Sequence, residues 1–88
     1  MNQYFFRIIR EWDPLDFTGL MEFIKPHWYA CEWGYWKKRG NKYYISTAGW
    51  SDNEEIVANM EKNFVWWAFH WYSSMRGGHY VFIGRDIK

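Results

Sequence analysis

The aromatic content of this chain exceeds what a domain of its size buries in one core. Eight Trp, seven Tyr and seven Phe make up 25% of the 88 residues. Each ring offers roughly 150–250 Å² of surface for burial, and a chain of this length forms one small domain that hides only about 60–65% of the surface of its unfolded state. We therefore expect some of the rings to lie at the surface, where they are available to a ligand or a partner.

The charge balance argues against a general binder of nucleic-acid backbones. Eleven basic and ten acidic residues leave a net charge of +1, whereas such binders carry a clear basic stripe. A basic cluster is present at Lys37, Lys38, Arg39 and Lys42. We interpret it as the solvated tip of a hairpin.

Cysteine content and hydropathy restrict the class of protein further. The single cysteine, Cys31, excludes an internal disulfide and a zinc site built on several cysteines. The first residues show no signal-peptide pattern, and no stretch approaches the roughly 20 apolar residues of a membrane span. We expect one domain over residues 1–88, located in the cytoplasm, without contact to a membrane and without a metal or another cofactor.

In the first half of the chain, the sequence predicts a strand, a helix and a hairpin. Aromatic and β-branched residues indicate a strand over residues 3–11. The next segment has helical spacing of apolar residues, with Asp13 as the cap, Pro14 at the first position and Pro26 as the stop. Residues 30–37 and 42–48 then form a hairpin around Gly40–Asn41. The apolar helical face comprises Phe17, Leu20, Met21 and Ile24, and the hairpin register places Trp36 opposite Ile45.

The second half predicts a helix followed by another hairpin. Ser51 and Glu54 have the spacing of a capping box, so we expect a helix over residues 52–63. Residues 64–74 and 79–85 are aromatic strands joined by a glycine turn. A two- or four-residue loop places His70, Tyr72, Ser74, His79 and Val81 on one face, whereas a three-residue loop with a bulge breaks this assignment.

These elements together predict a two-layer α+β fold. The order is strand, helix, strand, strand, helix, strand, strand, which gives an antiparallel sheet of about five strands. Both helices are expected on one face of this sheet, so its other face is left open.

Two polar segments that contain glycine are candidate ligand sites. The loop into the second helix offers backbone N–H groups to an anion and a ring for stacking. The last hairpin turn offers an arginine fork and a close approach to the backbone. A capped helix and an ordinary glycine turn are the alternative interpretations. The candidate ligand-binding residues are Thr47, Gly49, Trp50, Ser51, Ser74, Arg76, Gly77, Gly78 and His79.

The open sheet face is the third candidate. Exposed rings there provide either a stacking platform for bases or the centre of a dimer interface, and we expect a homo-oligomer. Its residues are Trp33, Tyr35, Tyr44, His70 and Tyr72. We identify no catalytic residues, because no nucleophile elbow, carboxylate pair, dinucleotide fingerprint or phosphate-binding loop is present.

Two motifs carry a resemblance to a known family. STAGWSDNEEI and SSMRGGHYVF, within residues 46–83, resemble small uncharacterised proteins of tailed bacteriophages. Their pattern is Gly-Gly-Trp-Ser-x-Asn-Glu, then Ser-Ser-x-Arg-Gly-Gly-His-Tyr, and Ala48 stands at the first glycine of that pattern. The resemblance implies a phage accessory protein in the cytoplasm of the bacterial host, with a role against host defences.

The sequence thus favours a non-catalytic binding protein. The leading hypothesis is sequestration of a nucleotide-like ligand, whose base stacks on Trp50 and whose phosphates are held by Arg76 and the glycine backbones. The first alternative is inhibition of a host protein through the aromatic face. The second is binding of single-stranded nucleic acid, which the near-neutral charge disfavours.

Overall fold

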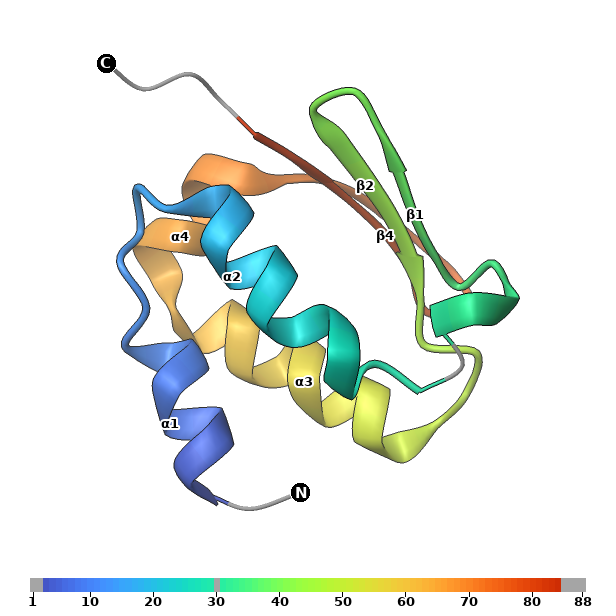
Figure 1. Cartoon of the computed structure of the whole chain (residues 1–88), viewed down its shortest axis with the longest axis horizontal. Helices are drawn as coiled ribbons and strands as arrows, with labels where there is room; N and C mark the ends of the chain where they lie inside the picture. The colour runs from blue at the N-terminus through green and yellow to red at the C-terminus, as the bar shows by residue number, and fades with distance from the viewer. Residues whose placement is uncertain (1–2, 30, 85–88) are drawn as a thin grey trace.

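The computed structural model describes residues 3–29 and 31–84, and Figure 1 shows their arrangement. Residues 1–2, 30 and 85–88 lie outside the described part, so the first residue of the predicted strand 30–37 and the last of 79–85 are not placed. The elements are α1 (Gln3–Arg10), α2 (Phe17–Ile24), a 3₁₀ turn η1 (Lys25–His27), a second one η2 (Cys31–Trp33), β1 (Trp36–Arg39), β2 (Lys42–Ser46), α3 (Ser51–Lys62), α4 (Phe64–His70), β3 (Trp71–Met75) and β4 (His79–Ile83).

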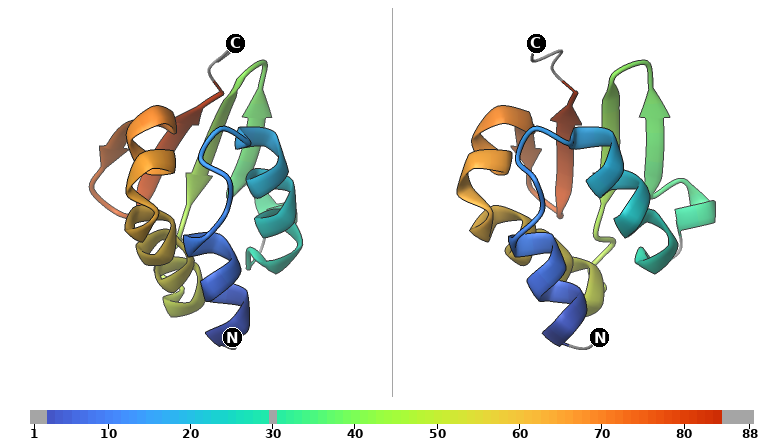
Figure 2. Two further views of the ribbon diagram at one scale, coloured as in Figure 1. Left: turned by 90° about the vertical axis from the view of Figure 1, so that its left-hand side faces the viewer. Right: turned by 60° about the vertical axis from the view of Figure 1, so that its left-hand side comes forward.

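The molecule is a two-layer α+β structure, as the sequence predicts. The strands form one antiparallel sheet in the order β1-β2-β4-β3. All the helices labelled in Figure 1 lie on the same side of this sheet (Figure 2). The prediction of about five strands is one too high for the described residues, which contain four strands and four α-helices.

The missing strand is the first predicted one, because residues 3–10 form helix α1. Its buried residues Phe5, Phe6 and Ile9 have the i, i+1, i+4 spacing of one helical side. On the exposed side the Arg7 guanidinium contacts the Glu11 carboxylate at 3.1 Å, an i,i+4 pair. The strand prediction was wrong because the same residues also fit a helical period, and packing against α3 overrides their β propensity.

Helix α2 has the predicted apolar face but a different start. Phe17, Leu20, Met21 and Ile24 are all buried. The cap is Asp16, whose carboxylate accepts a hydrogen bond from the Gly19 amide at 2.9 Å. The predicted cap Asp13 accepts instead from the Leu15 amide in the preceding turn, so the helix begins later than expected. As predicted, the helix ends just before Pro26, which lies in η1.

Helix α4 replaces the first half of a predicted strand. Trp66 and His70 are one helical turn apart, and both are fully buried. The Asn63 side chain, just before this helix, donates hydrogen bonds to the Ile9 and Trp12 carbonyl oxygens and so ties α4 to α1. Only Trp71–Met75 remain as a strand. The sequence-based prediction was wrong here because an aromatic run at i, i+4 spacing packs as well in a helix as in a strand.

His70 therefore lies on the covered side of the sheet, which corrects its predicted place on the open face. Its Nε2 is 3.0 Å from the Pro14 carbonyl oxygen and its Nδ1 is 3.2 Å from the Ile83 carbonyl oxygen. The ring links the segment before α2 to the end of β4. It also contacts the rings of Phe17 and Trp66, so its role is to join elements of the core.

The core fills the space between the helices and the covered face of the sheet. Trp66, Tyr43 and Phe82 are its largest fully buried side chains. Phe17 contacts Trp66 and Tyr43 with ring centroids 5.9 and 5.4 Å apart. Among residues 3–29 and 31–84, none of the helices has the length and apolar character needed to cross a bilayer.

Candidate functional site

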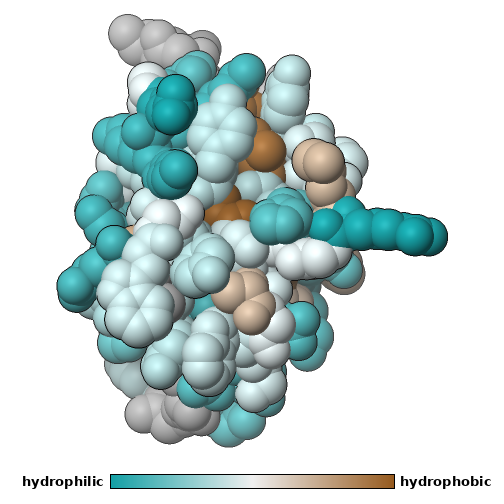
Figure 3. All heavy atoms as spheres, turned by 90° about the vertical axis from the view of Figure 1, so that its right-hand side faces the viewer, coloured by the Kyte–Doolittle hydropathy of each residue, from teal (hydrophilic) through white to brown (hydrophobic). Residues whose placement is uncertain are grey.

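The strand registers define an open face on the side of the sheet that faces away from the helices. Strand residues that lie directly opposite one another point to the same side. We call this side the open face, and Figure 3 views the molecule from there. Its residues form three rows across the strands: Arg39, Lys42 and Ile83; then Lys37, Tyr44, Val81 and Ser73; then Ser46, His79 and Met75.

A groove of about 530 Å³ lies on this face. In Figure 3, hydrophobic atoms lie in a hollow between hydrophilic side chains. The volume lies within the roughly 300–1,000 Å³ typical of small-molecule sites. The groove is lined by Gly34, Tyr35, Lys37, Tyr44, Ile45, Ser46, Met75, His79, Tyr80 and Val81.

Charge is segregated between the two layers of the molecule. The four strands contain Lys37, Lys38, Arg39 and Lys42 and no acidic residue, and the β3–β4 turn adds Arg76. Nine of the ten acidic residues lie in the helices or in the segments beside them, and the tenth, Asp86, is outside the described residues. The net charge of +1 therefore conceals a cationic sheet beneath an acidic helical layer.

The polar groups at the centre of the open face have no partner within the described part of the chain. Lys37, Tyr44 and His79 make no side-chain hydrogen bond or ion pair there. On the covered side, by contrast, the Tyr43 hydroxyl donates to Glu22 at 3.2 Å. The donors of the groove are thus free to bind a ligand without first breaking an internal contact.

The two predicted glycine segments meet at one end of this face. The Thr47 amide donates to the Gly78 carbonyl oxygen at 3.0 Å, directly beyond the pair Ser46 and His79. Gly78 has a φ of +79°, and a Cβ there would overlap the Thr47 hydroxyl. The loop and the turn therefore form one packed unit, in which Gly78 is required both for its backbone angle and for close approach.

A buried asparagine clamps the loop into α3. The Asn53 side chain donates to the Tyr29 and Thr47 carbonyl oxygens at 3.2 and 3.4 Å, and accepts from the Tyr29 amide at 2.8 Å. Ala48 is held at a φ of +52°, a region that favours glycine. The loop therefore holds a non-glycine residue in a left-handed backbone conformation.

The N-terminus of α3 is less suited to an anion than the sequence predicted. The N-cap is Trp50, without a side-chain cap bond, so the predicted capping box of Ser51 and Glu54 is not formed. Asp52 and Glu54 lie in the first turn and already complement the helix dipole. Their charges repel a phosphate at this end of the helix.

The predicted ligand residues divide between the groove and its surroundings. His79 lines the groove, and Arg76 and Gly77 lie in the turn that closes one end of β3 and β4. Trp50 and Gly49 are exposed in the loop, but the Trp50 ring packs on Tyr29 with centroids 4.2 Å apart and does not line the groove.

Ser74 lies on the covered face, where its hydroxyl accepts from the Trp71 indole at 2.8 Å. The loop between Met75 and His79 has three residues, and a register shift occurs between Trp71 and Ser73. A three-residue loop with a bulge is the arrangement for which the predicted assignment of residues to the two faces of this hairpin does not hold.

The predicted aromatic face is confirmed only in part. Tyr35 and Tyr44 line the groove. Tyr72, at the register shift, lies under Lys42, whose ammonium is 4.6 Å from the ring centroid. Trp33 is 74% exposed in η2, outside the sheet. The expectation that rings remain at the surface is thus met by Tyr72, Trp33 and Tyr44, while His70 is buried.

Sequence reasoning missed the contribution of Lys37 and Val81 to the groove and that of Asn53 to the loop. The basic cluster was recognised but was interpreted as a solvated tip. A signal was nevertheless present, because residues 33–51 and 62–85 contain no acidic residue at all. The role of Asn53 depends on contacts across 24 residues, so no local pattern reveals it.

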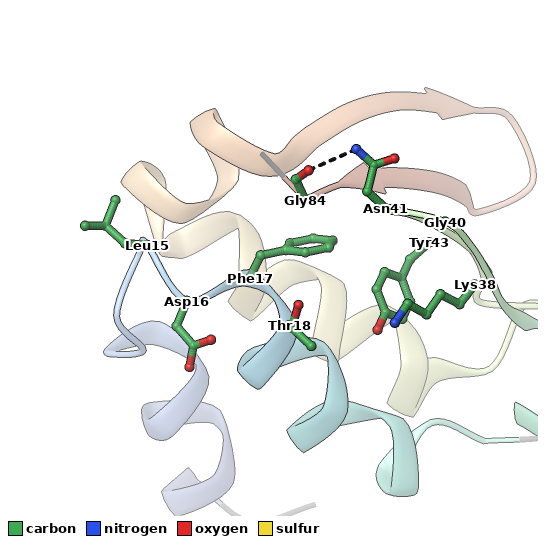
Figure 4. Close-up of a pocket in the computed structure, with 9 residues that line it drawn as sticks. All are labelled: Leu15, Asp16, Phe17, Thr18, Lys38, Gly40, Asn41, Tyr43 and Gly84. Carbon is green, nitrogen blue, oxygen red and sulfur yellow. Dashed lines mark hydrogen bonds between the residues drawn. The ribbon is translucent and has the colours of Figure 1, made fainter. Parts of the chain in front are cut away.

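A second hollow of about 400 Å³ lies on the covered side, between the start of α2 and the β1–β2 turn (Figure 4). Phe17, Lys38 and Tyr43 line it, but the Asp16 carboxylate at its edge is occupied by the Gly19 amide and the Trp12 indole. Burial, the charge of Glu22 and the hydrogen bond to it raise the pKa of Tyr43 to about 12. This hollow is also lined by Gly84, the last residue that the structure describes, and we assign no site there.

Within residues 3–29 and 31–84, no group of three or more His, Cys, Asp or Glu side chains is arranged to hold a metal ion. Comparisons with models of protein families, with curated proteins and with solved structures found no match.

Proposed function

We propose that this protein binds an anionic ligand with a planar ring, such as a nucleotide, in the groove of the open face. One observation carries the proposal: cations without an acidic partner and aromatic rings share a sheet face whose described residues include no carboxylate. A phosphate on this face meets only positive charge. A base has tyrosine and histidine rings beside it.

The position of each residue in the rows of the open face indicates its proposed role in binding. The Tyr44 ring, 39% exposed, provides a stacking surface next to the apolar Val81. The Lys37 ammonium, opposite Tyr44, pairs with a phosphate as a point charge. His79 and Ser46 supply hydrogen bonds at the other end of the groove.

The groove is also built on rigid elements, which reduces the entropy lost on binding. Its walls are formed by the four paired strands, and its end at Ser46 and His79 is fixed by the contact between Thr47 and Gly78. This site retains His79 from the predicted ligand site, and Tyr35 and Tyr44 from the predicted aromatic face. Stacking is reassigned from Trp50 to Tyr44, and the charge contact from the arginine turn to Lys37.

Calorimetric titration with cyclic nucleotides, ADP-ribose and inorganic phosphate tests the proposal. We expect a nucleotide to bind the wild-type protein and the Lys37→Glu variant to lose affinity by roughly 10- to 100-fold, because a charge-assisted hydrogen bond contributes about 1.5–3 kcal/mol. Tyr44→Ala should lose affinity for nucleotides, while its weak interaction with phosphate alone is unchanged.

The neighbouring Lys38→Glu variant is the matched control. Lys38 is also exposed and lies on the same strand, but it faces the covered side near Tyr43. Equal losses for the two variants would show that only overall charge matters. If none of the nucleotides binds the wild-type protein, the proposal fails.

Single-stranded nucleic acid is a second candidate ligand. The net charge of +1 argues against it, but the concentration of cations on the sheet favours it. Arg39 and Lys42 extend the cationic surface beyond the groove toward the β1–β2 turn, where Lys42 covers the Tyr72 ring. An oligothymidylate series added to the same titrations separates the two ligands. Affinity that rises with length and falls steeply with salt identifies a strand, whereas a mononucleotide that binds as tightly as the oligomer identifies a nucleotide site.

Sequestration needs tight binding without turnover. A groove with rings and donors but without an identified general base fits this role. In a phage protein, as the sequence resemblance implies, such a site would remove a nucleotide signal from the host.

A further inference from the structure

The open face carries a second pairing of a ring with a cation, outside the groove. The Lys42 ammonium lies 4.6 Å from the centroid of the Tyr72 ring. Neither residue lines the groove, and Tyr72 is 53% exposed. The strand residues beside Lys42 are Arg39 on β1 and Ile83 on β4, so this row contains a further cation, an apolar side chain and no carboxylate. The row repeats the combination of ring and cation found in the groove.

The register shift in β3 places the Tyr72 ring on this face. The residues before and after it pair with Phe82 and Val81 of β4, so Tyr72 is an extra residue between two successive pairs. Bulges of this kind redirect a side chain. The contact with Lys42, which itself belongs to the open face, puts the ring on the same side. The bulge thus brings a second exposed ring to the open face.

The Tyr44 and Tyr72 rings come from different strands, with β4 between them. Two strand spacings of roughly 4.8 Å separate their backbones by about 10 Å. Bases that stack on one another are only about 3.4 Å apart. Each ring therefore has room for a base of its own. Two bases bound in this way are unstacked from each other, as when aromatic side chains bind successive bases of a single strand.

We propose that the open face binds a ligand of two nucleotide units, with one base on Tyr44 in the groove and the other on Tyr72. This inference rests on the proposed function and adds a second subsite to it. Lys42 lies on the same side of β2 as Tyr44, and its ammonium reaches Tyr72. It is therefore placed to bind the phosphate that joins the two units. The chemistry recognised is that of a dinucleotide, either free or as part of a strand.

The second base has to displace the Lys42 ammonium from the Tyr72 ring. A cation–π contact at an exposed site is weaker than the stacking of a base on an aromatic ring. The ammonium also gains a phosphate partner in exchange. The exchange is favourable for a ligand that has both a base and a phosphate. Phosphate alone would leave the ring without a stacking partner, and a base alone would leave the lysine without an anion.

Calorimetric titration of the wild-type protein with AMP, ADP and the dinucleotide pApA tests the second subsite. ADP carries a second phosphate but no second base, so it controls for charge. We expect pApA to bind more tightly than ADP by roughly 5- to 100-fold, the range for one stacked base. Longer oligoadenylates then distinguish the two sources of the ligand. Affinity that stops rising at two units identifies a free dinucleotide, whereas affinity that continues to rise identifies a strand.

Variants of Tyr72 assign this preference to its ring. Tyr72→Ala should abolish it, so that pApA binds no more tightly than ADP, whereas Tyr72→Phe should retain it because the ring is kept. Tyr4→Ala is the matched control, since Tyr4 is 71% exposed on α1 in the helical layer, and should keep all three wild-type affinities. Circular dichroism checks that the variants are folded.

NMR of the wild-type protein gives a readout that needs no variant. Addition of pApA should shift the ring signals of both Tyr44 and Tyr72, whereas AMP should shift chiefly those of Tyr44. Ring signals of Tyr72 that do not respond to pApA overturn the inference.

The failure of this inference differs from the failure of the proposed function. If AMP, ADP and pApA all fail to bind, the proposed function fails and the second subsite fails with it. If ADP and pApA bind equally, the groove stands and the two-unit ligand is ruled out. The same holds if Tyr72→Ala weakens AMP as much as pApA, because the two rings then hold one base together.

Discussion

The two faces of the sheet are built by alternate residues of the same strands, yet they have opposite properties. Tyr43 and Phe82 face the helices and are 2% and 0% exposed, whereas their neighbours Tyr44 and Val81 face outward. Both faces contain rings. The difference is that four α-helices of this chain cover one face, whereas no helix of the described residues covers the open face.

The comparison shows that aromatic content alone does not identify a binding surface. On the covered face, rings pack on one another and their polar atoms bond to this chain, as for Tyr43 with Glu22. On the open face, rings lie beside cations that have no acidic partner. We infer that covered rings contribute to folding, and that open rings are available for binding at little cost in stability.

Replacing one residue on each face of β4 gives the largest expected contrast. Phe82→Ala removes a fully buried ring that contacts Trp66 and Trp67, and should lower the free energy of unfolding by about 3–5 kcal/mol. Val81→Ala, its neighbour on the open face, should cost about 1 kcal/mol or less. Urea unfolding of the two variants measures both values. Equal losses would show that the open face is packed against something in the free protein.

The two histidines allow a second comparison of the faces, with a smaller effect. His70→Phe removes the ring N–H that can donate to one of the two carbonyl oxygens beside it, those of Pro14 and Ile83, and should destabilise the protein by about 1–3 kcal/mol. His79→Phe, on the exposed side, should change stability by less than about 0.5 kcal/mol. The test is thermal unfolding of both variants. A larger loss for His79 would mean that the open face supports the fold.

The layers of this fold could be predicted from sequence, while two of its elements could not. The β1–β2 register is confirmed, with Trp36 opposite Ile45, because glycine and asparagine fix a short turn. The buried face of α2 is confirmed because its apolar spacing fits only a helix. Residues 3–10 and 64–70 were assigned wrongly because their aromatic and β-branched residues are dense enough to satisfy both periods, and tertiary packing decides between them.

The candidate site could be predicted only in outline. The glycine segments at Thr47 and Gly78 do meet, as the sequence-based hypothesis proposed from their positions at strand ends. The sequence-based prediction placed Ser74 on the wrong face of the sheet, because the face depends on the length of the turn between Met75 and His79. The charge of the open face was missed because net charge averages over both layers, and only the fold shows which residues share a side.

Two adjacent tyrosines offer the finest test of the comparison. Burial, with the charge and hydrogen bond of Glu22, raises the pKa of Tyr43 to about 12 from an ordinary value of 10.0. The folded state therefore holds this proton more tightly than the unfolded state. The resulting stabilisation is complete below pH 10.0, falls as the pH rises toward 12, and is lost above it. Tyr43→Phe should remove this part of the alkaline loss of stability, whereas Tyr44→Phe should retain it, as measured by urea unfolding across that range. If both variants keep the wild-type pH dependence, then Tyr43 ionises as freely as a residue of the open face, and the contrast between the two sides of the sheet does not extend to the tyrosine hydroxyl.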